Sequence, residues 1–171
     1  MHYFFSLCLR LTWADVRRNP SQAVKQGHPQ ASVLCTPTLA GGYDTESLHT
    51  FYFETFQPRL EQLNARLISR TVGTDRVVDE VLLSFKHDKG IPWLLPNVPP
   101  TQKQVKIMLV SILSVKAGKV HQESLYWDQA SILVQMGLLD PSLLPQKAKE
   151  SGVGKLPVVG AEAVKKRLQG M

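Results

Sequence analysis

The stretch VKIMLVSILSVKAGKVHQESLYWDQASILVQMG, residues 105–137, decides the fold. Residues 105–115 and 119–127 both read as strands in which apolar and polar side chains alternate. The pair Ala117-Gly118 between them suits a two-residue hairpin turn. We therefore expect two long antiparallel strands that lead into a short helix, which Gly137 ends.

Two more strands are predicted before this hairpin, at residues 65–71 and 76–87, with Gly73 in the turn between them. One face of the second strand carries Asp79 and His87 together with Val77, Val81, Leu83 and Phe85. Because this apolar face should point inward, both ionisable side chains need partners or a wet cavity. Eight residues separate them, roughly 26 Å on an extended strand, so strand geometry alone does not make them a catalytic pair.

The region before these strands predicts one short strand and one helix. Residues 31–36 alternate as a strand, and Pro37 and the pair Gly41-Gly42 mark the turn that follows. Asp44 or Thr45 can cap a helix. The apolar residues of that helix recur at helical spacing and predict a buried aromatic face: Leu48, Phe51, Tyr52 and Phe56. Residues 12–26 also have helical character, interrupted by Pro20.

Hairpin-linked strands, with helices gathered at the two ends of the chain, predict an α+β domain built on an antiparallel sheet. A chain of 171 residues, 43% hydrophobic and 20% charged, is long enough for one globular domain with a proper core. We expect a single domain over residues 1–171. Within it, residues 1–30 form a segment that is hard to interpret, and residues 142–171 form a tail with a short helix.

The charge and the cysteines of the chain indicate which binding partners and which cellular compartment to expect. The net charge of +6 comes from scattered Lys and Arg, with one dense group at residues 165–167, so we expect no nucleic-acid binding. Cys8 and Cys35 form no CxxC pair, which favours a reduced, cytoplasmic protein. No apolar run approaches the roughly 20 residues of a membrane helix, and a signal peptide is not favoured. We expect neither a cofactor nor a metal, because His121 and Glu123 lack an evident third ligand.

Asp128 has two readings. It follows a strand and precedes a helical run, which is the place of an N-cap residue. It is also a carboxylate beside apolar residues, and desolvation in a cavity would raise the pKa of such a group towards the working pH. The loop at residues 90–102 likewise has two readings: its apolar residues, with Trp93 foremost, form either a lid or docking surface, or an anchor in the core.

Several features of residues 31–141 resemble the SnoaL-like polyketide cyclase and dehydratase group of the nuclear transport factor 2-like superfamily, and fungal members most closely. The matching features are a histidine that ends a long strand, a Pro-Pro-Thr turn, a Gly-Lys hairpin, and a Trp-Asp pair followed by Leu-x-Gln-x-Gly. They lie at His87, residues 99–101, residues 118–119 and residues 127–137. Where the group usually has a glycine after the Pro-Pro-Thr turn, this chain has Gln102.

The resemblance implies a cone, in which a strongly curved antiparallel sheet wraps a pocket that N-terminal helices close, and it implies a homodimer. It also implies that Asp128 is the acid–base residue and that His87 assists it by polarising an enolate oxygen. The expected substrate-binding residues are Trp93, Tyr126, Trp127, His121 and Phe85. The function implied is a cofactor-free isomerase, cyclase or dehydratase acting on a small hydrophobic polyketide- or terpenoid-like molecule. The alternative is a non-catalytic dimeric module of the same fold that binds a ligand or a protein.

Overall fold

A computed structural model describes residues 28–56, 58 and 63–170 of the chain. The helical character predicted for residues 12–26, and Cys8, lie outside the described residues. Among the described residues, no helix is both long and apolar enough to cross a membrane.

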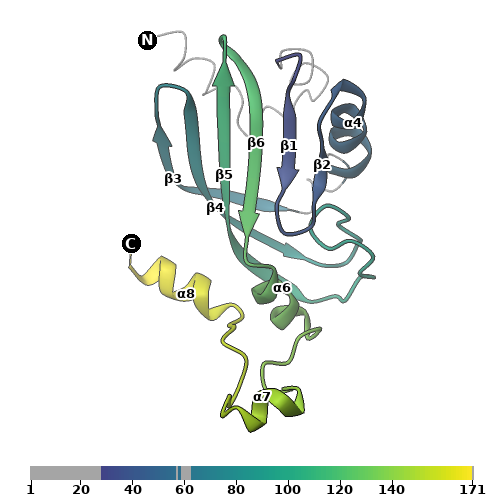
Figure 1. The fold of residues 1–171 in the computed structure, drawn as a ribbon, viewed down its shortest axis with the longest axis vertical. Helices are drawn as coiled ribbons and strands as arrows, with labels where there is room; N and C mark the ends of the chain where they lie inside the picture. Colours follow the sequence, from purple (N-terminus) through teal and green to yellow (C-terminus); the bar gives the residue numbers. More distant parts are fainter. Residues whose placement is uncertain (1–27, 57, 59–62, 171) are drawn as a thin grey trace.

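One six-stranded sheet organises the described residues (Figure 1). Its strand order is β2-β1-β6-β5-β4-β3. The strands are β1 (Ser32–Cys35), β2 (Ala40–Gly42), β3 (Asn64–Val72), β4 (Arg76–Lys86), β5 (Gln104–Lys116) and β6 (Lys119–Trp127). Five of them were predicted from the sequence to within one or two residues at each end. The turn between β5 and β6 is the expected one, with Ala117 at φ 50° and Gly118 at φ 72°.

The sheet is mixed, whereas the sequence predicted an antiparallel one. Four of its five pairings are antiparallel, but β1 runs parallel to β6 and pairs Val33 with Glu123 and Cys35 with Leu125. The long connection between β1 and β6 in the chain permits this direction, because only a short hairpin forces two neighbouring strands to be antiparallel.

The prediction that Gly41 and Gly42 form a turn was wrong. Residues 36–39 make the turn, and the two glycines belong to β2. Their role is close approach: a Cβ on Gly41 would lie 2.0 Å from the carbonyl oxygen of Val33 in β1. A Cβ on Gly42 would lie 2.6 Å from the backbone nitrogen of Leu48. Glycine at both positions therefore lets β2 pack between β1 and the following helix.

The predicted helix begins where expected. Asp44 is the N-cap of α4 (Thr45–Thr50), and its carboxylate accepts from the backbone N–H of Ser47 at 2.8 Å. The chain continues as η1 (Phe51–Phe56), a π-helical turn. Phe51 and Phe56 of this turn belong to the buried hydrophobic cluster, and the half-buried Tyr52 packs against it. This agrees with the predicted aromatic face.

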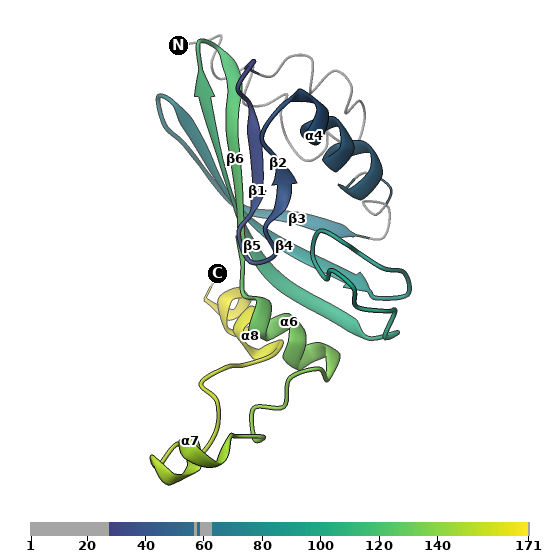
Figure 2. The same ribbon diagram turned by 45° about the vertical axis from the view of Figure 1, so that its right-hand side comes forward.

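The inner face of the curved sheet carries the core. Figure 2 shows α4 on the side towards which β3, β4 and β5 bend, so the helix lies over the concave face. The alternation predicted for β4 is confirmed: Val77, Asp79, Val81, Leu83 and Phe85 are all buried. The buried hydrophobic cluster also takes its members from the other strands, η1 and the loop that contains Trp93.

Three helices follow the sheet: α6 (Gln129–Met136), α7 (Gln146–Glu150) and α8 (Glu162–Gln169). Gly137 ends α6 in the left-handed conformation, as predicted (φ 73°). The C-terminal tail therefore holds two short helices rather than one. In α8, Arg167 donates to both carboxylate oxygens of Glu80 at 2.8 and 2.7 Å. Because Glu80 points away from the core, α8 packs on the outer face of the sheet, while α7 stands apart from it (Figures 1 and 2).

We predict that Gly41→Ala destabilises the fold by roughly 3 kcal/mol, because the new methyl group would collide with the backbone of β1. Gly118→Ala is the matched control: its Cβ would meet nothing within 4 Å, and only the left-handed backbone costs it about 1 kcal/mol. Urea unfolding of both variants checks this. Equal losses of stability would contradict the close packing of β2.

Candidate active site

Asp128 caps α6. Its carboxylate accepts from the backbone N–H of Ser131 at 3.1 Å, and its side chain is exposed at the end of β6. This is the geometry of an N-cap residue. It does not support a base that is removed from water at this position. The catalytic role that the resemblance implies for Asp128 stays a prediction.

The outer face of β6 holds Tyr126. Its side chain is 43% exposed and lies opposite Val110, whereas Leu125 and Trp127 are buried on the inner face. The alternation of the strand therefore separates Tyr126 from the interior of the cone. Tyr126 can reach a ligand only on the outer face of the sheet.

His87 is fully buried at the end of β4, and its ring anchors the loop that precedes β5. Its Nδ1 accepts from the backbone N–H of Thr101 at 3.2 Å, so the ring proton of the neutral form lies on Nε2. Burial lowers the pKa of His87, which favours that neutral form. Nε2 has no hydrogen-bond partner among the described residues, and it is the atom with which His87 would polarise an oxygen.

Trp93, Trp127 and Phe85 are core residues. The Trp93 ring packs against the rings of Phe56 and Trp127, with centroids 5.0 and 5.7 Å apart. Trp93 and Leu94 are 0% exposed and Leu95 is 1% exposed, so the reading of this loop as a docking surface was wrong. The loop is instead anchored in the core through these residues, which was the alternative prediction from the sequence.

His121 lies near the start of β6, where the pairing of this strand with β5 is irregular. Its ring meets the ring of His28 edge to face, with centroids 5.0 Å apart. It also lines a shallow groove of about 360 Å³ with Arg76 and Lys116. Among the described residues, no three His, Cys, Asp or Glu side chains cluster as metal ligands would.

Besides Asp79 of β4, the inner face of the sheet carries the carboxyl group of Glu123. It lies on the inner face of β6, two residues before Leu125, and both of its oxygens are hydrogen-bonded. Ser111 Oγ of β5 donates to Oε1 at 3.0 Å, and the Tyr52 hydroxyl of η1 donates to Oε2 at 3.1 Å. A helix and two strands thus place one carboxyl and two hydroxyl groups together.

Burial raises the pKa of Glu123, and the hydrogen bonds from Ser111 and Tyr52 offset this only in part. The negative charge of Asp79 adds to the increase. Burial and the neighbouring Glu123 in turn raise the pKa values of the Tyr52 hydroxyl and the Cys35 thiol. A carboxyl group whose pKa is moved upwards can both accept and donate a proton nearer to neutral pH.

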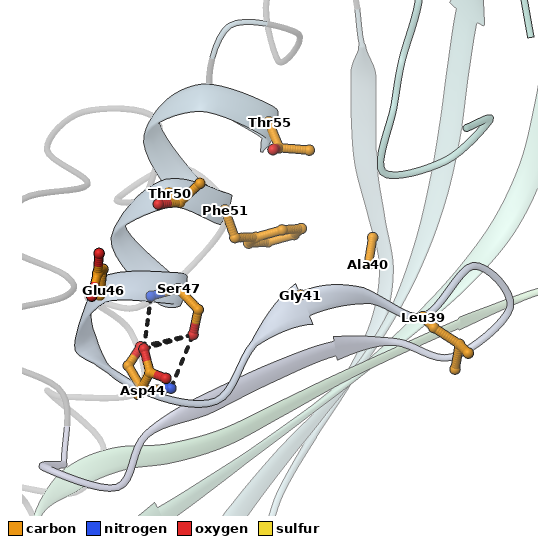
Figure 3. Close-up of a pocket in the computed structure, with 9 residues that line it drawn as sticks. All are labelled: Leu39, Ala40, Gly41, Asp44, Glu46, Ser47, Thr50, Phe51 and Thr55. Carbon is orange, nitrogen blue, oxygen red and sulfur yellow. Dashed lines mark hydrogen bonds between the residues drawn. The ribbon is translucent and has the colours of Figure 1, made fainter. Parts of the chain in front are cut away.

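An open groove of about 550 Å³ also lies between β2 and α4 (Figure 3). Figure 3 shows Phe51 pointing across it towards Ala40, with Asp44 and Ser47 at one end. The hydrogen bonds from Ser47 lower the pKa of Asp44. A carboxylate that is held ionised by its cap is a weak base, so this groove does not offer the chemistry of the Glu123 site.

From the sequence, Glu123 was weighed only as a metal ligand, and Tyr52 and Ser111 were assigned to no site. One signal was present: alternation puts Glu123 on the same face as Leu125 and Trp127, opposite to Asp128. The partners came from elements 71 and 12 residues away in the chain, and no local pattern reveals such contacts.

Comparison with known proteins identifies the fold. No family model and no curated protein matches the sequence. AclR, a proposed hydroxylase from Streptomyces galilaeus, matches with a TM-score of 0.59 and 21% identity, over 88% of this chain and 94% of AclR. A proposed SnoaL-like polyketide cyclase from Jannaschia sp. CCS1 matches with a TM-score of 0.59 and 17% identity, over 81% of this chain and 94% of that one.

An NTF2-like protein from Burkholderia thailandensis gives a TM-score of 0.57 at 14% identity, over 78% of this chain and 96% of its own. At such identities the likeness shows the fold alone. The chain has the α+β fold of nuclear transport factor 2-like proteins, and it is similar in structure to SnoaL-like polyketide cyclases. This confirms the expected fold class and resemblance, although the expected closeness to fungal members is not supported.

We predict that Asp128→Ala loses about 1 kcal/mol of stability, because α6 loses its cap, while Asp128→Asn changes stability by only a few tenths. Thermal unfolding of the two variants checks this. A large loss in the Asn variant would mean that the carboxylate charge does more than cap the helix.

Glu123 should make stability depend on pH. The folded protein keeps the Glu123 proton at pH values where the unfolded chain has lost it, so the free energy of unfolding falls as pH rises from the ordinary glutamate range through the raised pKa. Glu123→Gln removes this dependence and should gain stability relative to the wild type as pH rises. Urea unfolding across this range measures the difference, with the exposed Glu54→Gln as control. A pH-independent difference would contradict the raised pKa.

Proposed function

We propose that this protein is a cofactor-free acid–base enzyme that moves a proton on a small, largely apolar molecule held in the cone, with Glu123 as the proton carrier. The observation that carries the proposal is the Glu123 carboxyl on the inner face of the sheet, hydrogen-bonded by Ser111 and Tyr52. The reaction class is isomerisation, cyclisation or dehydration.

The chemistry follows from this arrangement. In its ionised form Glu123 takes a proton from a carbon next to a carbonyl group, and the electron pair of the broken C–H bond passes into an enolate. The protonated carboxyl then returns the proton to another atom of the same molecule. The two hydroxyl groups stay with the carboxyl and orient it, and the raised pKa keeps both protonation states accessible.

The surroundings support an apolar substrate. The nearest inner-face neighbours of Glu123 along β1 and β6 are apolar, Val33 and Leu125, so we expect an apolar substrate beside it. One solved structure of a ketosteroid isomerase-like fold, from Catenulispora acidiphila, contains trimethylamine, so a protein of this fold holds a small organic molecule. Polyketide- or terpenoid-like compounds, a homodimer and a cytoplasmic location remain parts of the proposal.

Solvent deuterium exchange tests this function. A panel of apolar β-diketones and β,γ-unsaturated ketones is incubated with the protein in D₂O, and mass spectrometry follows deuterium uptake and double-bond shift. We expect turnover by the wild type and a loss of about 100-fold or more in Glu123→Gln, which is the usual contribution of a positioned acid–base group.

Asp128→Asn and His87→Gln in the same assay test the residues that the resemblance implies. With Glu123 as the proton carrier, Asp128→Asn keeps the wild-type rate. Loss of exchange in Asp128→Asn, with exchange intact in Glu123→Gln, would return the catalytic role to the aspartate. If the protein binds the same ketones but neither the wild type nor any variant catalyses exchange, the result favours a non-catalytic module that binds a ligand.

A further inference from the structure

A row of polar side chains crosses the inner face of the sheet and ends at Glu123. The strand register places Arg70 of β3 opposite Asp79 of β4, and Asp79 opposite Ser111 of β5. Arg70 donates to both oxygens of Asp79 at 2.6 and 2.5 Å, and Ser111 donates to Glu123 at 3.0 Å. We call Arg70, Asp79, Ser111 and Glu123 the polar row.

The polar row lies where the hydrophobic core ends. On one side of it, the inner-face residues of β4 and β5 belong to the buried cluster: Val81, Leu83, Phe85, Val105, Ile107 and Leu109. On the other side, Val77 and Leu113 do not belong to it. The row therefore has a packed apolar wall along one flank, and charges beside such a wall interact over longer distances than they do in water.

We propose that Asp79 is a positioning residue whose negative charge holds the proton on Glu123, and that Arg70 keeps Asp79 in place. This inference rests on the proposed role of Glu123 as the proton carrier. Asp79 and Glu123 lie two strands apart and are offset by two residues along the strands, roughly 12 Å between their backbones for strands spaced by ~4.8 Å and residues by ~3.3 Å. A like charge at that distance disfavours ionisation of Glu123.

The other groups that face Glu123 do not carry this effect. Tyr52 of η1 and Ser111 of β5 contact it, and Cys35 of β1 lies on the same face. Burial and Glu123 raise the pKa values of Tyr52 and Cys35, so both stay neutral where a carboxyl group titrates. Asp79 and its partner Arg70 supply the charges of the polar row.

Carbon-13 NMR of protein labelled at the glutamate carboxyl carbons measures the titration midpoint of Glu123, whose signal is assigned by its loss in Glu123→Gln. We expect Asp79→Asn to lower this midpoint by about one pH unit. The matched control is Asp75→Asn, which also breaks an aspartate–arginine pair, at 2.9 Å, but an exposed one. It should leave the midpoint unchanged.

Arg70→Gln gives a change of opposite sign. It leaves the charge of Asp79 unbalanced, so the Glu123 midpoint should rise. The proposal is overturned if Asp79→Asn leaves the midpoint unchanged or raises it, or if Asp75→Asn produces the same shift. Should Asp79→Asn fail to fold, Arg70→Gln decides: a rise supports the proposal, and an unchanged or lower midpoint refutes it.

This titration needs no substrate, so its result is separate from that of the ketone exchange assay. Shifts of the expected signs without any exchange would refute the proposed function but keep the electrostatic link between Asp79 and Glu123. If exchange depends on Glu123 but its titration midpoint does not change in Asp79→Asn, the proposed function is kept and the electrostatic link between Asp79 and Glu123 is refuted.

Discussion

The structure depends on placing the Glu123 carboxyl group on the inner face of a sheet whose core is mainly apolar. Removing a carboxylate from water is costly unless hydrogen bonds replace the lost hydration. Here the hydroxyls of Ser111 and Tyr52 do so, and they join strand β5 and helical turn η1 to strand β6. The same contact therefore closes the helix onto the sheet and prepares a group whose pKa is raised by burial.

Polar groups in this interior have a consequence for stability as well as for chemistry. Each hydrogen bond to Glu123 is worth only about 1 kcal/mol net, whereas an unpaired buried charge costs more. An apolar side chain at position 123 would be the simpler solution for a core. The fold instead keeps a carboxyl group whose pKa is raised, and ionisable groups with shifted pKa values are candidates for functional residues.

The sequence predicted much of the fold because its signals were local. Alternation located five strands, Ala117-Gly118 located the hairpin, and the N-caps Asp44 and Asp128 located two helices. Gln102 adopts φ 60°, in the left-handed region that favours glycine, at the position where the resemblance led us to expect a glycine.

The site was harder to predict. Asp128 belongs to the Trp-Asp pair with which the most specific signature of the resemblance begins, so it was assigned the catalytic role, whereas its geometry is that of a helix cap. Glu123 was visible in the alternation of β6, but its partners are brought to it by tertiary packing. The parallel pairing of β1 with β6 and the strand role of Gly41 were missed for the same reason, since both depend on contacts between distant segments.

Infrared spectroscopy tests the central claim most directly, because a protonated carboxylic acid and a carboxylate absorb at different frequencies. Over a series of pH values, the account predicts one carboxylic acid carbonyl band in the wild type that persists to higher pH than the bands of ordinary glutamates and is absent from the Glu123→Gln variant. If the substitution removes no such late-titrating band, the result contradicts the account.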